Sequence, residues 1–357
     1  MKVLMVTPIV DERDSILGFI PSWINHLAQK VDKLNVVTLG YNENTHLLKN
    51  VTVHSLDKVA GKLGKILYFN NTMFRLLHEE ADAMFCHMYP SLAIRAAPYA
   101  KLLGIPVVWW RTHGSVSLTA RIVHFLADKV VTASKESFRI KSHKVIITGH
   151  GIDTDRFKPA ENFTGKNKNK TILLYVGRIS PRKHIETLIK AAAILVNKQG
   201  MRDLVLVIVG GVPVTSQEPL LEELKIMVNE LELGNYVEFV GAVPYSNVVD
   251  YYQQCDLFIT GSQTGSIDKN VLEAMACEKP AIACNEAFED VFGVYSKLLM
   301  FNKEDPYDLA HKIVSILEMD KDQHDKLCTS MRETVEHEHN IDNLTVTLVE
   351  VFKSCRR

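Results

Sequence analysis

The stretch ILLYVGRISPRK, residues 172–183, joins an apolar run to a glycine and several basic residues. The apolar half predicts a buried strand of a parallel sheet. Gly177 follows that strand and permits a close approach of the backbone to a ligand, and a helix is predicted from Lys183 to Asn197. A helix start offers unpaired N–H groups and a positive dipole end, to which Arg178 and Lys183 add two cations. The spacing leaves two interpretations open: a diphosphate grip, or a strand–helix turn with solvated basic side chains.

A second stretch, TGSQTGSIDKNVLEAMACEKPAIA at residues 260–283, predicts a strand end, a glycine-rich loop, a helix and another strand. Gly261 and Gly265 permit close backbone approach, and Asp268 is predicted to cap the helix. The unpaired amides of that helix start are suited to phosphate oxygens. Glu273 lies one turn further on, among apolar residues, where a carboxylate is costly to bury without partners. We consider two roles for it: accepting hydrogen bonds from a ribose diol, or facing water on an amphipathic helix.

Working outward, short β-rich runs alternate with longer helical patterns along the whole chain. This alternation is typical of an α/β fold with parallel sheets. The first series of predicted strands covers residues 2–7, 34–39, 51–55, 83–87, 106–109, 129–132 and 144–148. The second series covers residues 172–177, 204–211, 236–241, 256–261 and 280–285. Helices are predicted between them, for instance at 19–31 and 92–103.

A polar, Lys- and Asn-rich segment without periodicity separates the two series, which is the composition of a linker. We therefore predict a first domain at 1–150, a linker at 151–170 and a second domain at 171–338. Residues 339–357 contain an amphipathic helical pattern that we expect to pack back on one of the domains, the first being the candidate. Ligands of open parallel sheets bind beyond the carboxyl ends of the strands, so we expect the site in a cleft between the two domains.

Composition narrows the classes of function. The chain has 357 residues, 46% of them hydrophobic, with 41 Lys+Arg against 42 Asp+Glu. This balance gives no electrostatic footprint for nucleic acid, so we expect no nucleic-acid partner. The six cysteines form no C-x-x-C pair, which argues against a disulfide framework or a zinc site and favours a reducing cytoplasm. The short apolar run at the start ends at Pro8, so we expect no signal peptide, and no run approaches the length of a membrane span.

Beyond these local patterns, the sequence resembles the GT-B glycosyltransferases of family 4. The resemblance covers most of the second domain in the right order and spacing, and an ordered set is more specific than any single motif. Its pieces there are TGHGIDTDRFKP (148–159), GRISPRK (177–183), YVEFVGAVPYSNVVDYYQQCDLFITGS (236–262) and VLEAMACEKPAIA (271–283). The first domain matches more loosely, through TPIVDERDSILGF (7–19), IPVVWWRTHG (105–114) and ADKVVTASKESF (127–138).

The resemblance implies two Rossmann-like domains facing across a cleft, with a nucleotide-diphosphate sugar on the second and an acceptor on the first. It implies retention of the anomeric configuration without a divalent metal or other cofactor. Arg178 and Lys183 fall on the pair that neutralises the diphosphate, and His113 falls near the sugar-transfer centre. The donor-binding positions are Gly18, Gly177, Gly211, Ala242, Val243, Ser266, Asp268, Lys269, Asn270 and Glu273, the last at the ribose. We assign Phe19, Trp23, His87 and Trp110 to the acceptor side.

The sequence also departs from the family pattern. Where the family has a second glutamate, eight positions before Glu273, this chain has Gly265. The donor-sugar contact is therefore expected to differ, through Ser266, Asp268 or the backbone. Lys269 is unusual as well, and either contacts phosphate or faces solvent. The glycine that usually follows the diphosphate lysine is replaced by His184.

Together these features predict a retaining, metal-independent glycosyltransferase in the cytoplasm. The acceptor is expected to be a carbohydrate or a lipid-linked molecule of surface polysaccharide or glycolipid synthesis. Two alternatives stay open: a nucleotide-sugar epimerase of the same fold, which needs no acceptor, and a non-catalytic nucleotide-sugar binding protein.

Residues 58–77 combine an apolar stripe with basic residues. The apolar members are Leu63, Ile66, Leu67, Phe74 and Leu77, and the basic ones are Lys58, Lys62, Lys65 and Arg75. Such a segment either covers the sheet as an ordinary helix or docks on the anionic inner face of the cell membrane, as interfacial helices do.

Overall fold

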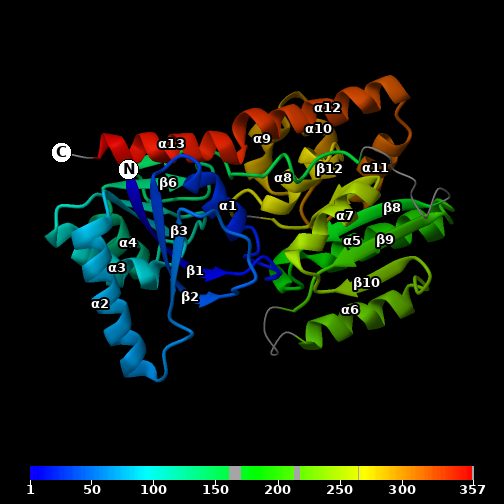
Figure 1. The fold of residues 1–357 in the computed structure, drawn as a ribbon. Coiled ribbons are helices and arrows are strands. Elements are labelled where there is room, and N and C mark those ends of the chain that lie inside the picture. Colours follow the sequence, from blue (N-terminus) through cyan, green and yellow to red (C-terminus); the bar gives the residue numbers. More distant parts are fainter. Residues whose placement is uncertain (161–169, 213–217, 264, 356–357) are drawn as a thin grey trace. The chain divides into compact units, whose positions relative to one another are not determined.

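The chain folds into two units, each built on its own parallel sheet. The computed structural model describes residues 1–160, 170–212, 218–263 and 265–355 (Figure 1). One unit consists of Met1–Asp153 and Glu338–Arg357, and the other of Thr154–His337. The last helix of the chain therefore belongs to the first unit.

The linker predicted at 151–170 is not a separate piece where the structure describes it. Residues 151–153 belong to the first unit and residues 154–160 to the second, so the chain passes between units at Asp153. Residues 161–169 of the predicted linker lie outside the described residues.

The first unit is built on a seven-stranded parallel sheet of order β3-β2-β1-β4-β5-β6-β7. The central strand β1 is almost wholly buried because both faces of the sheet are covered, which explains its continuous apolar run. The strands are β1 Lys2–Val10, β2 Lys33–Tyr41, β3 Val51–Ser55, β4 Ala83–His87, β5 Val107–Trp110, β6 Lys129–Thr132 and β7 Val145–Ile147.

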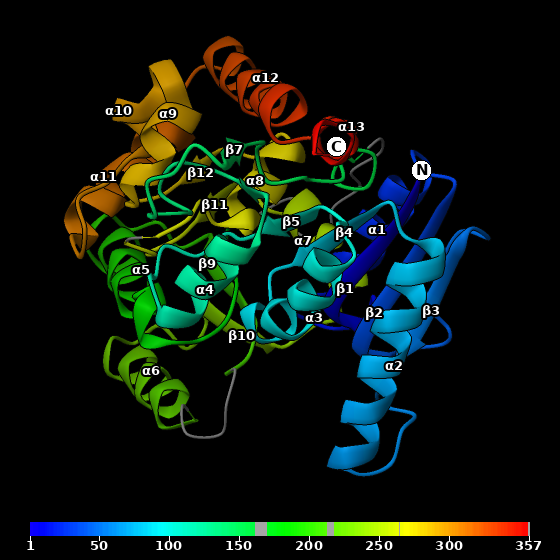
Figure 2. The same cartoon turned by 90° about the vertical axis from the view of Figure 1, so that its left-hand side faces the viewer.

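Side chains alternate along β1 and so feed two separate cores. Val3 and Met5 pack with α1 (Ile20–Ala28) and the C-terminal helix α13 (Ile341–Ser354). Leu4 and Val6 pack with the helices of the other face. The ribbons of these helices can be followed in Figure 2. Those helices are α2 Lys62–Glu80, α3 Pro90–Leu102 and α4 Leu118–Leu126. The sheet thus forms the middle layer of three.

The second unit has a five-stranded parallel sheet of order β10-β9-β8-β11-β12. Its strands are β8 Thr171–Val176, β9 Leu204–Val209, β10 Val237–Gly241, β11 Leu257–Ile259 and β12 Ala281–Ile282. Its helices of eight or more residues are α5 Ile185–Ala193, α6 Glu218–Glu230, α8 Lys269–Ala276, α11 Pro306–Leu317 and α12 Lys321–Glu338. Shorter helices are α7 Val248–Gln254, α9 Glu289–Phe292 and α10 Ser296–Leu299. The predicted α/β fold with two parallel sheets is confirmed.

The helix predicted from Lys183 to Asn197 is wrong in its first turn. Pro181–Lys183 form a short 3₁₀ turn, and His184 takes the left-handed conformation with φ 45° and ψ 47°. The α-helix begins only at Ile185, after this reversal, and ends in a π turn at Ile194–Lys198. The left-handed residue re-aims the chain so that Lys183 precedes the helix instead of lying in it.

Among the described residues, no helix combines the length and the apolar character that a bilayer crossing requires.

Candidate functional site

In the second unit, the loops that follow three neighbouring strands meet at the carboxyl edge of the sheet. The Gly177 amide donates to the Val209 carbonyl at 2.9 Å, and the Gly210 amide donates to the Gly241 carbonyl at 2.8 Å. A Cβ on Gly210 would lie only 1.9 Å from the Gly177 carbonyl oxygen. Glycine is therefore required for the backbones to approach this closely, and they form one continuous edge where ligands of parallel sheets bind.

Lys183 lies at this edge and is paired. Its Nζ atom donates to the two carboxylate oxygens of Asp268 at 2.9 and 3.0 Å and to Ser262 Oγ at 2.8 Å. The Lys183 and Asp268 side chains are only 15% and 21% exposed, so solvent screens the pair weakly. The pair joins the turn after β8 to the start of α8. It thereby connects the two segments, 172–183 and 260–283, that the sequence predicts to bind a diphosphate.

Asp268 occupies the predicted N-cap position of α8, but its side chain does not cap the helix. The Lys183 amine takes up both carboxylate oxygens instead, which adds the attraction of a full positive charge to the hydrogen bonds. The expectation of a side-chain cap is therefore wrong. An anion that binds Lys183 has to compete with Asp268 for the same amine.

Arg178 has an exposed side chain, while its backbone is fixed by a hydrogen bond from the Tyr175 hydroxyl to the Arg178 carbonyl at 2.9 Å. Asn270, in the first turn of α8, donates from Nδ2 to the Val176 carbonyl. This bond ties the helix start to the end of β8. The structure thus brings Arg178, Lys183, Asp268 and Asn270 to one edge of one sheet.

Glu273 is 4% exposed, so the interpretation that it faces water is wrong. Its Oε1 accepts from the Tyr245 hydroxyl at 2.7 Å, and its Oε2 accepts from the Tyr252 hydroxyl at 2.9 Å. Burial raises the pKa of the Glu273 carboxyl, and Lys269, both hydroxyls and Arg156 oppose the rise. The partners that a buried carboxylate needs are therefore two tyrosines.

Sequence reasoning missed Tyr245, Tyr252 and Arg156. The Arg156 guanidinium lies over the Tyr245 ring, 4.6 Å from its centroid, and donates to the Tyr245 carbonyl at 2.7 Å. Lys269 lies near the same ring, with Nζ 5.7 Å from the centroid, so it is placed against an aromatic face and is partly buried. Helical periodicity gave no signal for this arrangement, because Tyr245 lies in a 3₁₀ turn and Tyr252 in α7.

The remaining predicted donor positions lie in the loops that follow strands. The Gly211 carbonyl accepts from the Ile179 amide at 2.9 Å, and a Cβ on Gly211 would lie 3.3 Å from that of Ala242. Ala242 is exposed and Val243 is partly buried in the loop after β10. The Ser266 carbonyl accepts from Asn285 at 3.3 Å. Gly18 is buried in the first unit, where its amide donates to Asp14.

Three of the four predicted acceptor-side residues are core residues of the first unit. Trp23, His87 and Trp110 are 3%, 1% and 1% exposed. Trp23 packs against the other two, with ring centroids 5.1 Å from His87 and 4.9 Å from Trp110. Phe19 is partly buried at the margin of this cluster, 6.1 Å from Trp23. The structure thus places the aromatic residues in packing rather than on an open surface.

His113 differs from these residues because its side chain is exposed. Its Nδ1 accepts a hydrogen bond from the Ser115 amide at 3.1 Å. This bond fixes the ring on the loop that follows β5, at the carboxyl edge of the first sheet.

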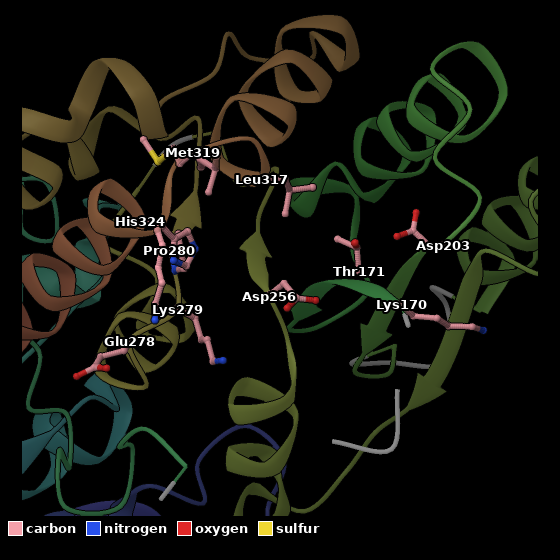
Figure 3. Close-up of a pocket in the computed structure, with 12 residues that line it drawn as sticks. Lys170, Thr171, Asp203, Asp256, Glu278, Lys279, Pro280, Leu317, Met319 and His324 are labelled. Atoms are coloured by element: carbon pink, nitrogen blue, oxygen red, sulfur yellow. The ribbon is translucent and has the colours of Figure 1, made fainter. Parts of the chain in front are cut away.

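A cavity of about 530 Å³ opens at the opposite, amino edge of the second sheet (Figure 3). Thr171 begins β8 there, and Asp256 and Pro280 directly precede β11 and β12. None of the residues that line it is a predicted site residue. Because sites of parallel sheets form beyond the carboxyl ends, we do not assign the function to this cavity.

Comparison with known proteins agrees with the fold and shows the family. The family model described as "Glycosyl transferases group 1" matches residues 157–336, which is half of the chain. The matched range contains Lys183, Asp268 and Glu273.

Curated relatives match part of the chain. It is 32% identical over 147 residues to D-inositol 3-phosphate glycosyltransferase 2 of Catenulispora acidiphila, covering 39% of this chain and 34% of that protein. It is 26% identical over 234 residues to the D-inositol 3-phosphate glycosyltransferase of Geodermatophilus obscurus, covering 62% and 49%. The chain thus spans less than half the length of either relative.

Solved structures match nearly the whole chain at low identity. Anabaena HepE in complex with UDP-glucose has a TM-score of 0.78 and 17% identity, with 99% of this chain and 100% of that chain covered. Sucrose-phosphate synthase of Thermosynechococcus elongatus has a TM-score of 0.76 and 17% identity, with 99% of each chain covered. At these identities the similarity shows the fold.

Proposed function

The chain belongs to the group 1 glycosyl transferases, and from this premise we propose that it is a retaining glycosyltransferase that uses a nucleotide-diphosphate sugar. The observation that carries the proposal is the ion pair of Lys183 with Asp268 at the start of α8, the helix that also carries the buried Glu273. The Lys183 cation, beside the start of α5, suits a diphosphate. The Glu273 carboxylate, one turn into α8, suits a ribose diol. The UDP-glucose bound to Anabaena HepE, which has the same fold, supports a donor of this class.

In the proposed reaction the diphosphate displaces Asp268 from Lys183 and is also met by Arg178. These cations stabilise the negative charge that grows on the leaving oxygen. The acceptor hydroxyl attacks from the same face and gives its proton to the leaving phosphate. The transition state is oxocarbenium-like, as in glycoside hydrolysis. Because the two cations supply the neutralisation, we expect turnover to continue in the presence of a chelator.

The first test removes the cations. We expect the double variant Arg178→Gln with Lys183→Gln to lose turnover by at least about 100-fold, the scale of removing one pre-organised donor. The assay measures release of nucleotide from UDP-, GDP- and ADP-sugars with a panel of sugar and lipid acceptors. Lys190→Gln, at an exposed lysine of α5, is the matched control and should keep full activity. Near-normal turnover of the double variant, with its melting temperature unchanged, would contradict the mechanism.

Analysis of the donor sugar in the same incubations, together with a binding measurement, separates the alternatives. A change of the donor sugar without any acceptor would identify an epimerase. Specific binding of a nucleotide sugar without transfer to any acceptor would identify a binding protein.

We further propose that α2 docks on an anionic membrane, which would place the chain at the inner, cytoplasmic face and favour a lipid-linked acceptor. Leu63, Leu67 and Phe74 are 70%, 60% and 55% exposed on one side of this helix. Leu77 is not part of that face, because it is 2% exposed in the core. No acidic residue occurs between Lys58 and His78, so the apolar side chains are flanked by positive charge alone.

Flotation with vesicles tests this contact. We expect binding to vesicles that contain anionic lipid, little binding to neutral ones, and loss of binding in the variant Leu63→Ser with Leu67→Ser and Phe74→Ser. Equal flotation of this variant and the wild type would remove α2 from the contact.

A further inference from the structure

We propose that Tyr245 is a positioning residue that holds the Glu273 carboxylate for recognition of the donor's ribose. The inference rests on the proposed function, since it assumes that Glu273 meets a ribose diol. Tyr245 lies in the 3₁₀ turn Tyr245–Asn247, directly after the loop that follows β10. The loop and the carboxylate are thus connected through one side chain.

The hydrogen-bonding capacity of Glu273 supports a shared site. A carboxylate has about four acceptor positions, and the two tyrosine hydroxyls use one on each oxygen. The two hydroxyl donors of a 2′,3′-diol match the other two positions. Tyr245 therefore need not be displaced when a ribose binds. Its hydroxyl instead fixes the rotation of the carboxylate, which decides where these positions point.

The two tyrosines differ in their surroundings. Tyr252 is 0% exposed and packs between Phe157 and Phe258, with ring centroids 5.8 Å from each. Tyr245 is 9% exposed and lies at the rim of this aromatic group. Tyr252 is thus enclosed by the core, whereas Tyr245 borders the loop where a nucleotide is expected.

Two cations hold the Tyr245 ring in place. Arg156 lies 4.6 Å from its centroid and also bonds its carbonyl, and the Lys269 amine lies 5.7 Å away. Cation–π contacts of this geometry stabilise a fixed ring orientation. The arrangement joins Arg156, Tyr245 and Glu273 into one chain of contacts that ends at the carboxylate.

The test compares ribose with deoxyribose. Calorimetric titration first finds which of UDP, GDP and ADP the wild type binds, and then compares that nucleotide with its 2′-deoxy form. We expect the wild type to prefer the ribose form by about tenfold, the effect of one lost hydrogen bond to a charged group. Tyr245→Phe should reduce the preference to threefold or less by weakening the ribose form alone. A uniform structural defect would weaken both nucleotides equally and leave the ratio unchanged.

Two further variants make the result decisive. Tyr236→Phe is the matched control: its hydroxyl contacts Arg202 at 3.5 Å rather than Glu273, so we expect this variant to keep the wild-type ribose preference. Arg156→Lys keeps the Tyr245 hydroxyl but weakens the contact that orients the Tyr245 ring. Its preference for the ribose form should therefore lie between those of the wild type and Tyr245→Phe. A wild-type ratio in both Tyr245→Phe and Arg156→Lys overturns the inference and leaves the proposed function intact. If the wild type binds none of the three nucleotides, the proposed function fails, and the inference fails with it.

Discussion

The Lys183 amine and the Asp268 carboxylate lie 2.9 Å apart although 85 residues separate them in the chain. The pair is held in place by the backbone of the next residue, His184, whose φ of 45° reverses the chain between the 3₁₀ turn and α5. A histidine in this conformation is strained, because its Cβ approaches the following carbonyl oxygen. Local strain at the candidate site is thus present at the residue where the family pattern usually has glycine.

This strain gives a prediction for single residues. We expect His184→Gly to exceed His184→Ala in free energy of unfolding by about 1 kcal/mol, because only glycine adopts the left-handed region without cost. Both variants lose the contact between His184 Nδ1 and Glu186 at 3.3 Å, so alanine is the matched control. Urea denaturation followed by circular dichroism measures the difference. A glycine variant less stable than the alanine variant would show that the left-handed conformation is not strained.

The elements that build the site are strand ends, where the backbone and not the side chain sets the geometry. Gly210 combines a φ of 140° with a Cβ position 1.9 Å from the Gly177 carbonyl oxygen. Since that oxygen belongs to the backbone of the neighbouring strand end, it has little freedom to move. The loops after β8 and β9 are therefore coupled.

We expect Gly210→Ala to lower the free energy of unfolding of the second unit by about 2 kcal/mol or more, through overpacking and backbone strain. It should also weaken nucleotide binding, since the loops must separate. Gly234→Ala is the control, because a Cβ there meets nothing within 4 Å. Its free energy of unfolding should stay within about 0.5 kcal/mol of the wild-type value. Hydrogen exchange of peptides from β8 and β9 measures both variants. Equal protection in the two would show that the close approach has no energetic weight.

At the scale of the whole molecule, the first unit is closed by residues that are distant in sequence. Ile152 pairs with Asn340 in a parallel bridge, and the His150 amide donates to His339 Nδ1 at 3.2 Å. Gly149, with φ 73°, allows the contact, because a Cβ there would lie 1.8 Å from the Glu338 carbonyl oxygen. The chain thus leaves the first unit and returns to it at one place.

Burial of His339 at this closure predicts acid sensitivity of the first unit. Desolvation lowers the pKa of His339 from 6.5 to about 4. The His339 ring therefore binds a proton less tightly in the folded state than in the unfolded state. The first unit has its full free energy of unfolding above pH 6.5 and loses part of it as the pH falls toward 4. The full loss is about 3 kcal/mol.

The three tryptophans, Trp23, Trp109 and Trp110, all lie in the first unit, so their fluorescence follows its unfolding alone. We expect urea unfolding to show a smaller drop in stability between pH 7 and pH 4.5 for His339→Asn, which keeps an acceptor but cannot titrate. His337→Asn, at an exposed position, should show the wild-type drop. An identical drop in all three proteins would exclude His339 as the source.

Much of the fold could be predicted from local patterns. The strands β3, β4 and β6 have the predicted bounds, because each is a short apolar or β-branched run between polar segments. The turn at His184 could not be predicted in this way, because a non-glycine residue in the left-handed conformation leaves no trace in the apolar periodicity. The burial of Trp23 and Trp110 could not either, because an aromatic side chain suits both a sugar surface and a core.

The sequence by itself determined the alternation of strands and helices, the two series of parallel strands, the location of Lys183 after a strand end and that of Glu273 one turn into a helix. These features can be read from apolar periodicity and turn residues within short stretches of the chain. Only the tertiary structure decided that Asp268 neutralises Lys183, that Tyr245 and Tyr252 hold Glu273 and that the last helix belongs to the first unit. Such pairings join residues tens to hundreds of positions apart, and their partners are chosen by how whole elements pack and by which buried charge must be satisfied.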